Sequence, residues 1–244
     1  MPININSKGG EDFAPIPAGV HQGVCYGVVD IGTQPSKNPQ FAAKRKIVLL
    51  FELPHERADF GERKNQPRGS SVTLTQSLNE KAVLRKMLKS WRGRDFTPEE
   101  LKGFDPKVLV GINCQLNIVH ESKGDKTYAN ITSIMPLGKG MAKVAQENKP
   151  LYFSLDDQDL TSVKFPENMP KWMQEKITFC EEVMAATGVH GDHKGDGEGW
   201  ASNPEAEARH AEETRHYATS GQKPAGVKAA APAPQEEDGE DVPF

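Results

Sequence analysis

The chain of 244 residues has few cysteines and no long apolar run. Cys25, Cys114 and Cys180 are widely separated and form no CxxC pair, which excludes a disulfide framework and a zinc ribbon. We expect reduced thiols, buried as small apolar side chains. Because no run of about 18 apolar residues occurs, no transmembrane helix is expected. The N-terminus has no basic region followed by an apolar stretch, so no signal peptide is expected either.

The sequence also lacks the common enzyme motifs. It contains no GxxxxGK(S/T) phosphate loop, no GxSxG nucleophile turn and no HExxH zinc motif. Carboxylates in residues 1–149 show no spacing typical of two-metal nucleases. The segment His190–His193 contains metal-ligating residue types, but its glycine-rich surroundings lack the rigid support of metal sites, and we interpret it as a polar linker. We therefore expect a protein that is not an enzyme and has no cofactor and no bound metal.

Charge is distributed unevenly along the chain. Residues 1–149 carry 22 Lys and Arg against 15 Asp and Glu, whereas the remainder carries 8 against 19. A basic body with an acidic tail favours a polyanion as the partner of the body. Moderate charge asymmetry is also common in proteins with other functions, so this pattern alone does not identify the partner.

The segment 236–244 combines acids with a final apolar group. Such a segment has too much like charge and too little apolar surface to fold alone. One interpretation is a peptide hook, whose acids steer it to a basic surface of a partner while the phenylalanine enters a pocket. The alternative is a solvating acidic tail without a partner. The candidate partner-binding residues are Glu236, Glu237, Asp238, Glu240, Asp241, Val242, Pro243 and Phe244.

Asp241-Val242-Pro243-Phe244, placed behind these acids, resembles the C-terminal tip of bacterial single-stranded-DNA-binding proteins. Residues 17–54 and Pro170–Ile177 are similar to bacteriophage-encoded proteins of the same class. The tip covers less than a tenth of the chain. The resemblance implies that an OB-fold holds the DNA and that the tip docks replication and repair proteins. It also implies that the protein works in the cytoplasm of a bacterial host.

Five stretches show the alternating, β-branched and aromatic patterns of strands: 19–33, 44–53, 70–77, 108–121 and 127–137. Gly23 and Gly27 in the first stretch predict a bulge or strong coiling. In the second stretch, Ile47, Leu49, Phe51 and Leu53 share one face, and Lys46, Val48, Leu50 and Glu52 share the other.

A helix is predicted between the third and fourth strands. Apolar residues recur there at helical spacing from Val83 to Trp91, with Asn79 as the expected N-cap and Gly93 as the stop. A short second helix is expected to begin at Thr97. Three strands, a helix and two strands is the order of an OB-fold, a partly open barrel. The predicted fold class is mainly β, with an OB-fold-like five-stranded barrel, a helix between strands three and four, a helical C-terminal extension and a disordered acidic tail.

We predict five segments along the chain. They are an N-terminal arm (1–16), an OB-fold-like nucleic-acid-binding domain (17–150), a helical extension (151–187), a disordered linker (188–234) and an acidic partner-binding tip (235–244). In the extension, Trp172, Lys176 and Phe179 fall near one helical face. We expect this face to pack on the barrel or on another subunit, which leaves a homo-oligomer open.

Binding of single strands without sequence readout needs cations along the backbone and aromatic faces for the bases. An OB-fold presents these from the loops joining strands one and two and strands four and five. Tyr26 and Phe51 fit either the core or a stacking role, and Trp91 fits the core. The alternative is that these loops do not bind DNA, because exposed loops are commonly charged. The candidate DNA-binding residues are Lys37, Phe41, Lys44, Arg45, Lys46, Arg57, Phe60, Arg63, Lys64, Arg68, Lys123, Lys126 and Tyr128.

The sequence therefore favours a phage protein that binds and protects single-stranded DNA in replication, recombination or repair. Its partners are single-stranded DNA and the proteins recruited by the tip, and no membrane partner is expected. Two alternatives stay open. One is an interaction adaptor whose barrel binds protein, and the other is a phage nuclease with an unrecognised site.

Overall fold

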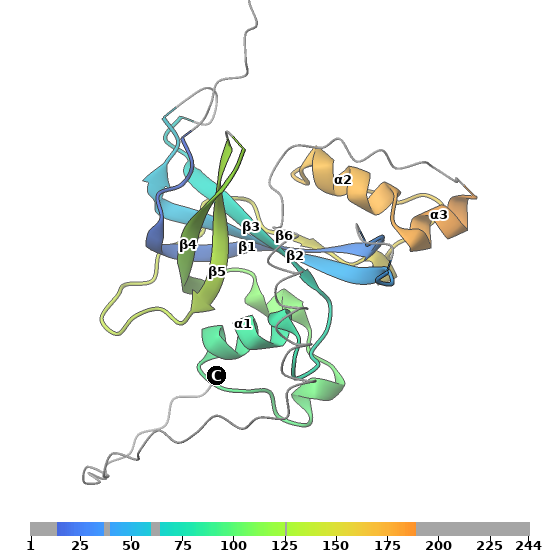
Figure 1. Ribbon diagram of the computed structural model, residues 1–244, viewed down its shortest axis with the longest axis horizontal. Coiled ribbons are helices and arrows are strands. Elements are labelled where there is room, and N and C mark those ends of the chain that lie inside the picture. Colours follow the sequence, from blue (N-terminus) through green and yellow to red (C-terminus); the bar gives the residue numbers. More distant parts are fainter. Residues whose placement is uncertain (1–13, 37–39, 60–63, 125, 189–244) are drawn as a thin grey trace, which may run out of the picture. The chain divides into compact units, whose positions relative to one another are not determined.

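The structure, a computed structural model, describes residues 14–36, 40–59, 64–124 and 126–188. All of them belong to one compact unit of the chain, whose bounds are Met1–Ser202. The elements of this unit are mainly strands (Figure 1). In chain order they are β1 (Gly19–Gln34), β2 (Lys44–Arg57), β3 (Pro67–Thr75), α1 (Val83–Arg92), η2 (Glu100–Lys102), η3 (Pro106–Leu109), β4 (Asn113–Lys123), β5 (Lys126–Met135), β6 (Leu151–Phe153), η4 (Leu155–Asp157), α2 (Lys171–Thr178) and α3 (Glu181–Thr187), where η denotes a short 3₁₀ helix.

Six strands form one sheet. Five of them are antiparallel in the order β3-β2-β1-β4-β5, and the short β6 pairs in parallel with β1. The first part of β1 pairs with β4 from Gly19, opposite Ile118, to Val24, opposite Asn113. Its later part pairs with β2 and β6. Within the described residues no hydrogen-bonded pair joins β3 to β5, so the sheet is not closed, although residues of these two edge strands approach each other. The mainly β class and the order of three strands, a helix and two strands are confirmed.

The long strand β1 bends where Gly27 allows it. The pairing with β2 shifts register between Cys25 and Gly27, which confirms the predicted bulge. A Cβ at Gly27 would lie 3.0 Å from the carbonyl oxygen of Leu151 and 2.8 Å from Cδ1 of Leu50. Only a residue without a side chain lets β6 approach so closely.

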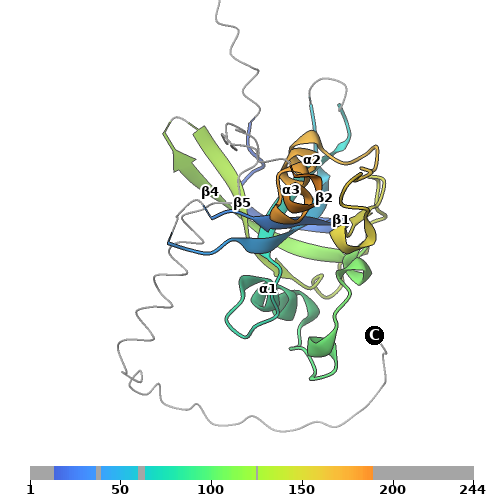
Figure 2. The same ribbon diagram turned by 90° about the vertical axis from the view of Figure 1, so that its right-hand side faces the viewer.

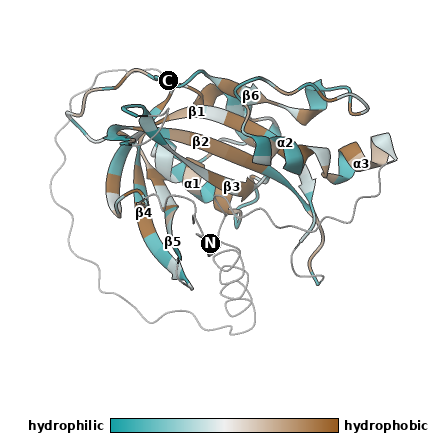
Figure 3. Cartoon of the chain, turned by 90° about the horizontal axis from the view of Figure 1, so that it is seen from above, coloured by the Kyte–Doolittle hydropathy of each residue, from teal (hydrophilic) through white to brown (hydrophobic). Residues whose placement is uncertain are grey.

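Apolar side chains of β1 and β2 are buried on both faces of the sheet. One face contributes Cys25, Phe51 and other residues to a cluster with α1, β4 and β5, which we call the inner core. The other face contributes Val29, Val48 and Leu50 to a second cluster with β6, α2 and α3, the outer core. Figure 2 shows α1 and the pair α2–α3 on opposite sides of β1 and β2. Figure 3 shows β2 as apolar along most of its length, whereas β4 and β5 alternate in hydropathy.

Several boundaries differ from those expected, and three of the differences lie between β3 and β4. The residue at the N-cap of α1 is Ala82, without a side-chain cap, and not Asn79. The helix expected from Thr97 is the three-residue η2. The strand expected from Val108 begins only at Asn113, because the Asp105 side chain accepts a hydrogen bond from Lys107 N at 2.9 Å and caps the turn η3.

The extension is more divided than expected. Two short helices, α2 and α3, meet near Cys180, and β6 precedes them. Met173 and Ile177 form the buried face of α2, whereas Trp172 packs only partly against the outer core. The expected face through Trp172, Lys176 and Phe179 is therefore wrong, since the helix turns its methionine and isoleucine inward.

Several smaller expectations are met. All three cysteines are buried and unpaired, and Phe51 and Trp91 belong to the inner core with ring centroids 5.7 Å apart. Burial raises the pKa of the Cys25 thiol to about 12. Among the helices of the described ranges, none is long and apolar enough to cross a membrane.

Candidate nucleic-acid interface

The predicted DNA-binding residues lie in three places: at the end of the β1–β2 hairpin, around the β2–β3 connection and at the tip of the β4–β5 hairpin. Part of the prediction falls outside the described residues. This applies to Lys37, Phe60 and Arg63, to Glu236, Glu237, Asp238, Glu240, Asp241, Val242, Pro243 and Phe244, and to the segment His190–His193.

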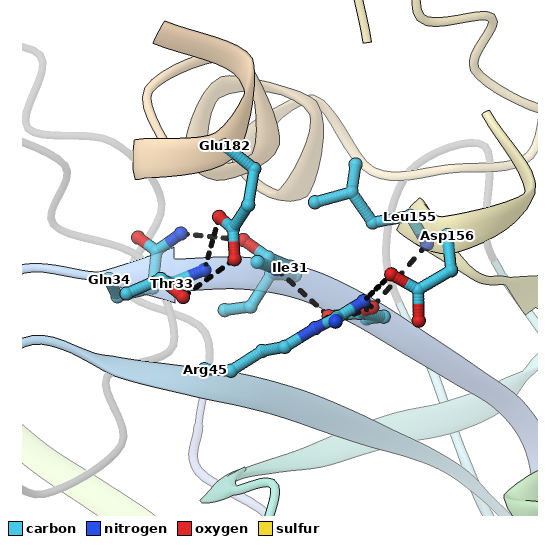
Figure 4. A network of polar contacts seen from close by, with 9 residues as sticks. Ile31, Thr33, Gln34, Arg45, Leu155, Asp156 and Glu182 are labelled. Carbon is cyan, nitrogen blue, oxygen red and sulfur yellow. Dashed lines mark hydrogen bonds and ion pairs between the residues drawn. The ribbon is translucent and has the colours of Figure 1, made fainter. Parts of the chain in front are cut away.

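Arg45, at the start of β2, is held by two carboxylates (Figure 4). Its Nε lies 3.3 and 3.1 Å from the two carboxylate oxygens of Asp30 on β1, and its Nη2 lies 2.7 Å from Oδ1 of Asp156 and also contacts Asp30. The hydrogen bond to Asp30 raises the pKa of Arg45 above its usual range. The backbone N–H of Leu155 donates to the same Asp30 carboxylate at 3.4 Å. Arg45 therefore ties β1 and β2 to η4.

The two lysines beside Arg45 are placed differently. Lys44 is exposed where β1 and β2 separate, opposite Gln34. Lys46 is half-buried, and its Nζ donates to Oγ1 of Thr75 on β3 at 3.2 Å. Phe41, in the same connection, is 36% exposed. The ammonium groups of Lys44 and Lys46 can bind phosphates of a nucleic acid here, and the ring of Phe41 can stack on a base.

Arg57 and Arg68 both form hydrogen bonds with other parts of the chain. Arg57 forms a two-bond pair with Glu147, with Nη1–Oε2 2.8 Å and Nη2–Oε1 2.6 Å. This pair raises the pKa of Arg57 and lowers that of Glu147. Arg68 donates to the backbone carbonyls of Ala14 and Pro15, the first residues that the structure describes. Lys64, by contrast, is exposed and has no partner among the described residues.

The tip of the β4–β5 hairpin concentrates positive charge. Lys123 and Lys126 are directly opposite each other and exposed. Tyr128 is half-buried opposite Glu121, two residues from Lys126 on the same strand. The hairpin thus brings the three predicted residues of this loop together.

The outward face of β3 is small and hydroxylated, and the sequence prediction did not include it. Ser71, Thr73 and Thr75 face outward beside Leu50, Val48 and Lys46 of β2, while Leu74 points into the inner core. Hydroxyl groups donate to phosphate oxygens, which position a nucleic acid without reading its sequence. The alternation of threonines against Val72 and Leu74 is the signal that could have identified this face.

The outward face of β2 is not open to a ligand. Val48 is 0% and Leu50 3% exposed, because the segment 151–183 covers them. Polar contacts hold that cover in place. Glu182 accepts hydrogen bonds from N and Oγ1 of Thr33 at 2.8 and 2.6 Å (Figure 4). Gln34 Nε2 also donates to the carbonyl of Lys176 at 2.9 Å.

A buried carboxylate fixes the connector that leads to this cover. Glu52 of β2 is 0% exposed. One of its oxygens accepts a hydrogen bond from Glu147 N at 2.7 Å, and the other accepts from N and Nδ2 of Asn148 at 2.7 and 2.6 Å. Three donors replace the water that the carboxylate loses on burial. A ligand path over the sheet therefore cannot cross the outward face of β2 at Val48 and Leu50.

A search for metal sites found no group of three or more His, Cys, Asp or Glu that could hold an ion in the part of the chain that the structure describes. In the comparisons with known proteins, no protein-family model matches the chain, and no curated protein sequence matches it.

Proposed function

We propose that this protein binds single-stranded DNA without sequence specificity, on an OB-type barrel, during phage DNA replication, recombination or repair. The observation that carries the proposal is the sheet order β3-β2-β1-β4-β5 with α1 between β3 and β4 and packed on the inner core. An OB-fold is a five-stranded, partly open barrel. A sheet whose edge strands β3 and β5 approach each other without pairing agrees with that architecture.

The proposed path of the strand runs from the β1–β2 hairpin, along the outward face of β3, to the β4–β5 hairpin. Lys44 and Lys46 stand at one end, and Lys123 and Lys126 at the other. Between them the hydroxyl groups of β3 offer neutral phosphate contacts. Phe41 and Tyr128 supply faces on which bases stack, each worth about 1–3 kcal/mol. Arg45 and Arg57 support the fold in this proposal, because their guanidinium groups are already paired with carboxylates.

Titration of labelled oligo-dT at two salt concentrations tests the proposal. The variant replaces Lys44, Lys46, Lys123 and Lys126 with alanine and leaves Arg45 in place to preserve its carboxylate contacts. Each lost phosphate contact on a single strand lowers the salt slope of log K by about 0.7, so four contacts lower it by about 2.8. A control with the same charge change replaces four other exposed lysines, Lys139, Lys149, Lys164 and Lys171. Equal slopes for the two variants would remove the four lysines from the path.

We also propose that the acidic tip recruits host replication and repair proteins in the bacterial cytoplasm. The support is the sequence of acids followed by Val242, Pro243 and Phe244. Phe244→Ala should abolish capture of those proteins by an immobilised 234–244 peptide, whereas oligo-dT binding by the whole protein stays intact. Recovery of the same proteins by both peptides would leave only a solvating role for the tail.

Binding without catalysis completes the proposal. It is distinguished from a nuclease by incubating the protein with the same oligonucleotide and Mg²⁺ or Mn²⁺ and following its length on a gel. Metal-dependent shortening of the oligonucleotide would favour the nuclease over the binding protein. Absence of salt-sensitive binding would favour an adaptor whose barrel binds protein.

A further inference from the structure

A cavity of about 430 Å³ opens beside α1, and its lining also includes Ile47 and Gln76, the residues that follow Lys46 and Thr75 in the chain. Leu84 and Leu88 of α1 line one side, and Leu101, Lys102 and Phe104 line the other. Pockets of about 300–1,000 Å³ are typical of binding sites. Leu101 is 38% exposed, so the apolar lining continues to the mouth of the cavity.

The wall formed by η2 and the turns around it is held rigidly. The carboxylate of Glu100 pairs with Arg92 and accepts from Arg94 at 2.9 and 3.0 Å. It also accepts from Thr97 N at 2.8 Å, while Thr97 Oγ1 accepts from Glu100 N at 3.3 Å, which makes a capping box. A wall fixed in this way loses little conformational entropy when a ligand binds.

The surroundings of the cavity are cationic. Residues 80–107 carry eight Lys and Arg against five Asp and Glu, and α1 itself has four cations and no acid. Arg85 and Lys89 are paired with Asp95. Lys102, which lines the cavity, is exposed and has no partner among the residues that the structure describes. The mouth therefore joins apolar surface to an available positive charge.

We infer that this cavity is a docking site for an acidic peptide of a partner protein that inserts one apolar side chain. The leucine-rich lining accepts an aliphatic or aromatic side chain, and Lys102 pairs with a neighbouring carboxylate. A nucleic acid fits less well, because bases stack on exposed aromatic faces and the lining is mostly aliphatic. The site goes beyond the proposed DNA binding and does not depend on it.

The test measures fluorescence polarisation of a labelled synthetic peptide in which a run of glutamates precedes one phenylalanine. The receptor is the full chain with Phe244→Ala, because the chain's own acids and Phe244 have the same pattern as the peptide. Lys102→Glu should weaken binding by about tenfold through charge reversal at the rim, and Leu101→Asp should abolish it. Lys164→Glu, which makes the same charge change at an exposed lysine of the covering segment, should leave binding unchanged. A peptide with alanine in place of phenylalanine should not bind.

Because Leu101 and Lys102 are both exposed, the variants should melt at the wild-type temperature, and Leu101→Ala provides a milder change of the apolar lining if Leu101→Asp does not fold. Equal affinity of all variants, or of the peptide without phenylalanine, overturns the proposal. Displacement of the peptide by oligo-dT, together with weaker oligo-dT binding by Lys102→Glu, would assign the cavity to the nucleic-acid surface instead. A change in sedimentation of Leu101→Asp with intact peptide binding would assign it to a second copy of the chain.

Discussion

Met173→Ala tests whether the segment 151–187 is part of the folded domain or an appendage to it. Met173 is 0% exposed and packs in the outer core, against side chains of β1 and β2. Truncating a buried methionine to alanine costs about 2–5 kcal/mol through lost burial and the cavity left behind. Met141 provides a matched control, because it is 39% exposed and the same change at a surface site stays within about 0.5 kcal/mol.

The assay is thermal and urea unfolding of the two variants beside the wild type. A loss of about 3 kcal/mol in a domain of this size lowers Tm by roughly 6–12 °C. Both variants are made in a chain with Trp172→Phe and Trp200→Phe, so that Trp91 is the one remaining tryptophan. Because the outer core shares β1 and β2 with the inner core, we expect a single transition in which the fluorescence of Trp91 changes together with the far-UV signal. Equal stability of Met173→Ala and Met141→Ala would refute the packing argument. A separate early transition that leaves the Trp91 signal unchanged would show that the segment unfolds on its own.

The order of strands and helix along the chain could be predicted because each element has its own local pattern. Alternation in 44–53, the helical spacing from Val83 to Trp91 and the turn after Lys123 are all readable within ten residues or so. The ends of strands and helices were less predictable where a side chain caps a turn. Asp105 begins a 3₁₀ turn in a stretch that otherwise has the apolar residues of a strand.

The outer core was missed although the sequence held a signal for it. Val48 and Leu50 alternate with Ile47 and Leu49, so β2 is apolar on both faces. Such a strand is normally buried on both sides, which requires a second layer. This layer consists of β6, α2 and α3, and its strand, β6, is three residues long and too short to show a period.

The candidate site was only partly predictable, because the sequence does not show which Lys or Arg side chains form ion pairs with Asp or Glu in the folded protein. Arg45 meets Asp156 across 111 positions, and Arg57 meets Glu147 across 90. Both arginines resemble DNA contacts in the sequence and serve as internal ties in the structure. Lys44, Lys64 and Lys123 extend from the surface instead. The distinction depends on long-range packing, which local patterns do not contain.

Three further predictions concern the contacts that hold this arrangement. Glu52→Gln should lower the free energy of unfolding in urea by about 1–3 kcal/mol, because an amide cannot accept all three donors that meet the buried carboxylate; Glu167→Gln, at an exposed site, is the control. Gly32→Ala should be more destabilising in the same assay than Gly93→Ala. Both glycines have φ near +70°, which costs about 1–2 kcal/mol for alanine, but only at Gly32 would the new Cβ lie 2.5 Å from the sulfur of Cys180. The last prediction concerns the loss of stability at low pH. Hydrogen bonds from Arg94 and Thr97 N, with Arg92 beside them, lower the pKa of Glu100 from 4.5 to about 2. The folded state therefore binds fewer protons at this carboxyl than the unfolded state, so its contribution to stability is complete above the unfolded pKa and is lost as the pH falls from about 4.5 towards 2. Urea midpoints measured between pH 6 and 2.5 (roughly that window) should fall less steeply for Glu100→Gln than for the wild type, whereas Glu99→Gln should follow the wild type. Identical acid profiles for Glu100→Gln and the wild type would show that the Glu100 network does not hold the wall of the α1 cavity in solution.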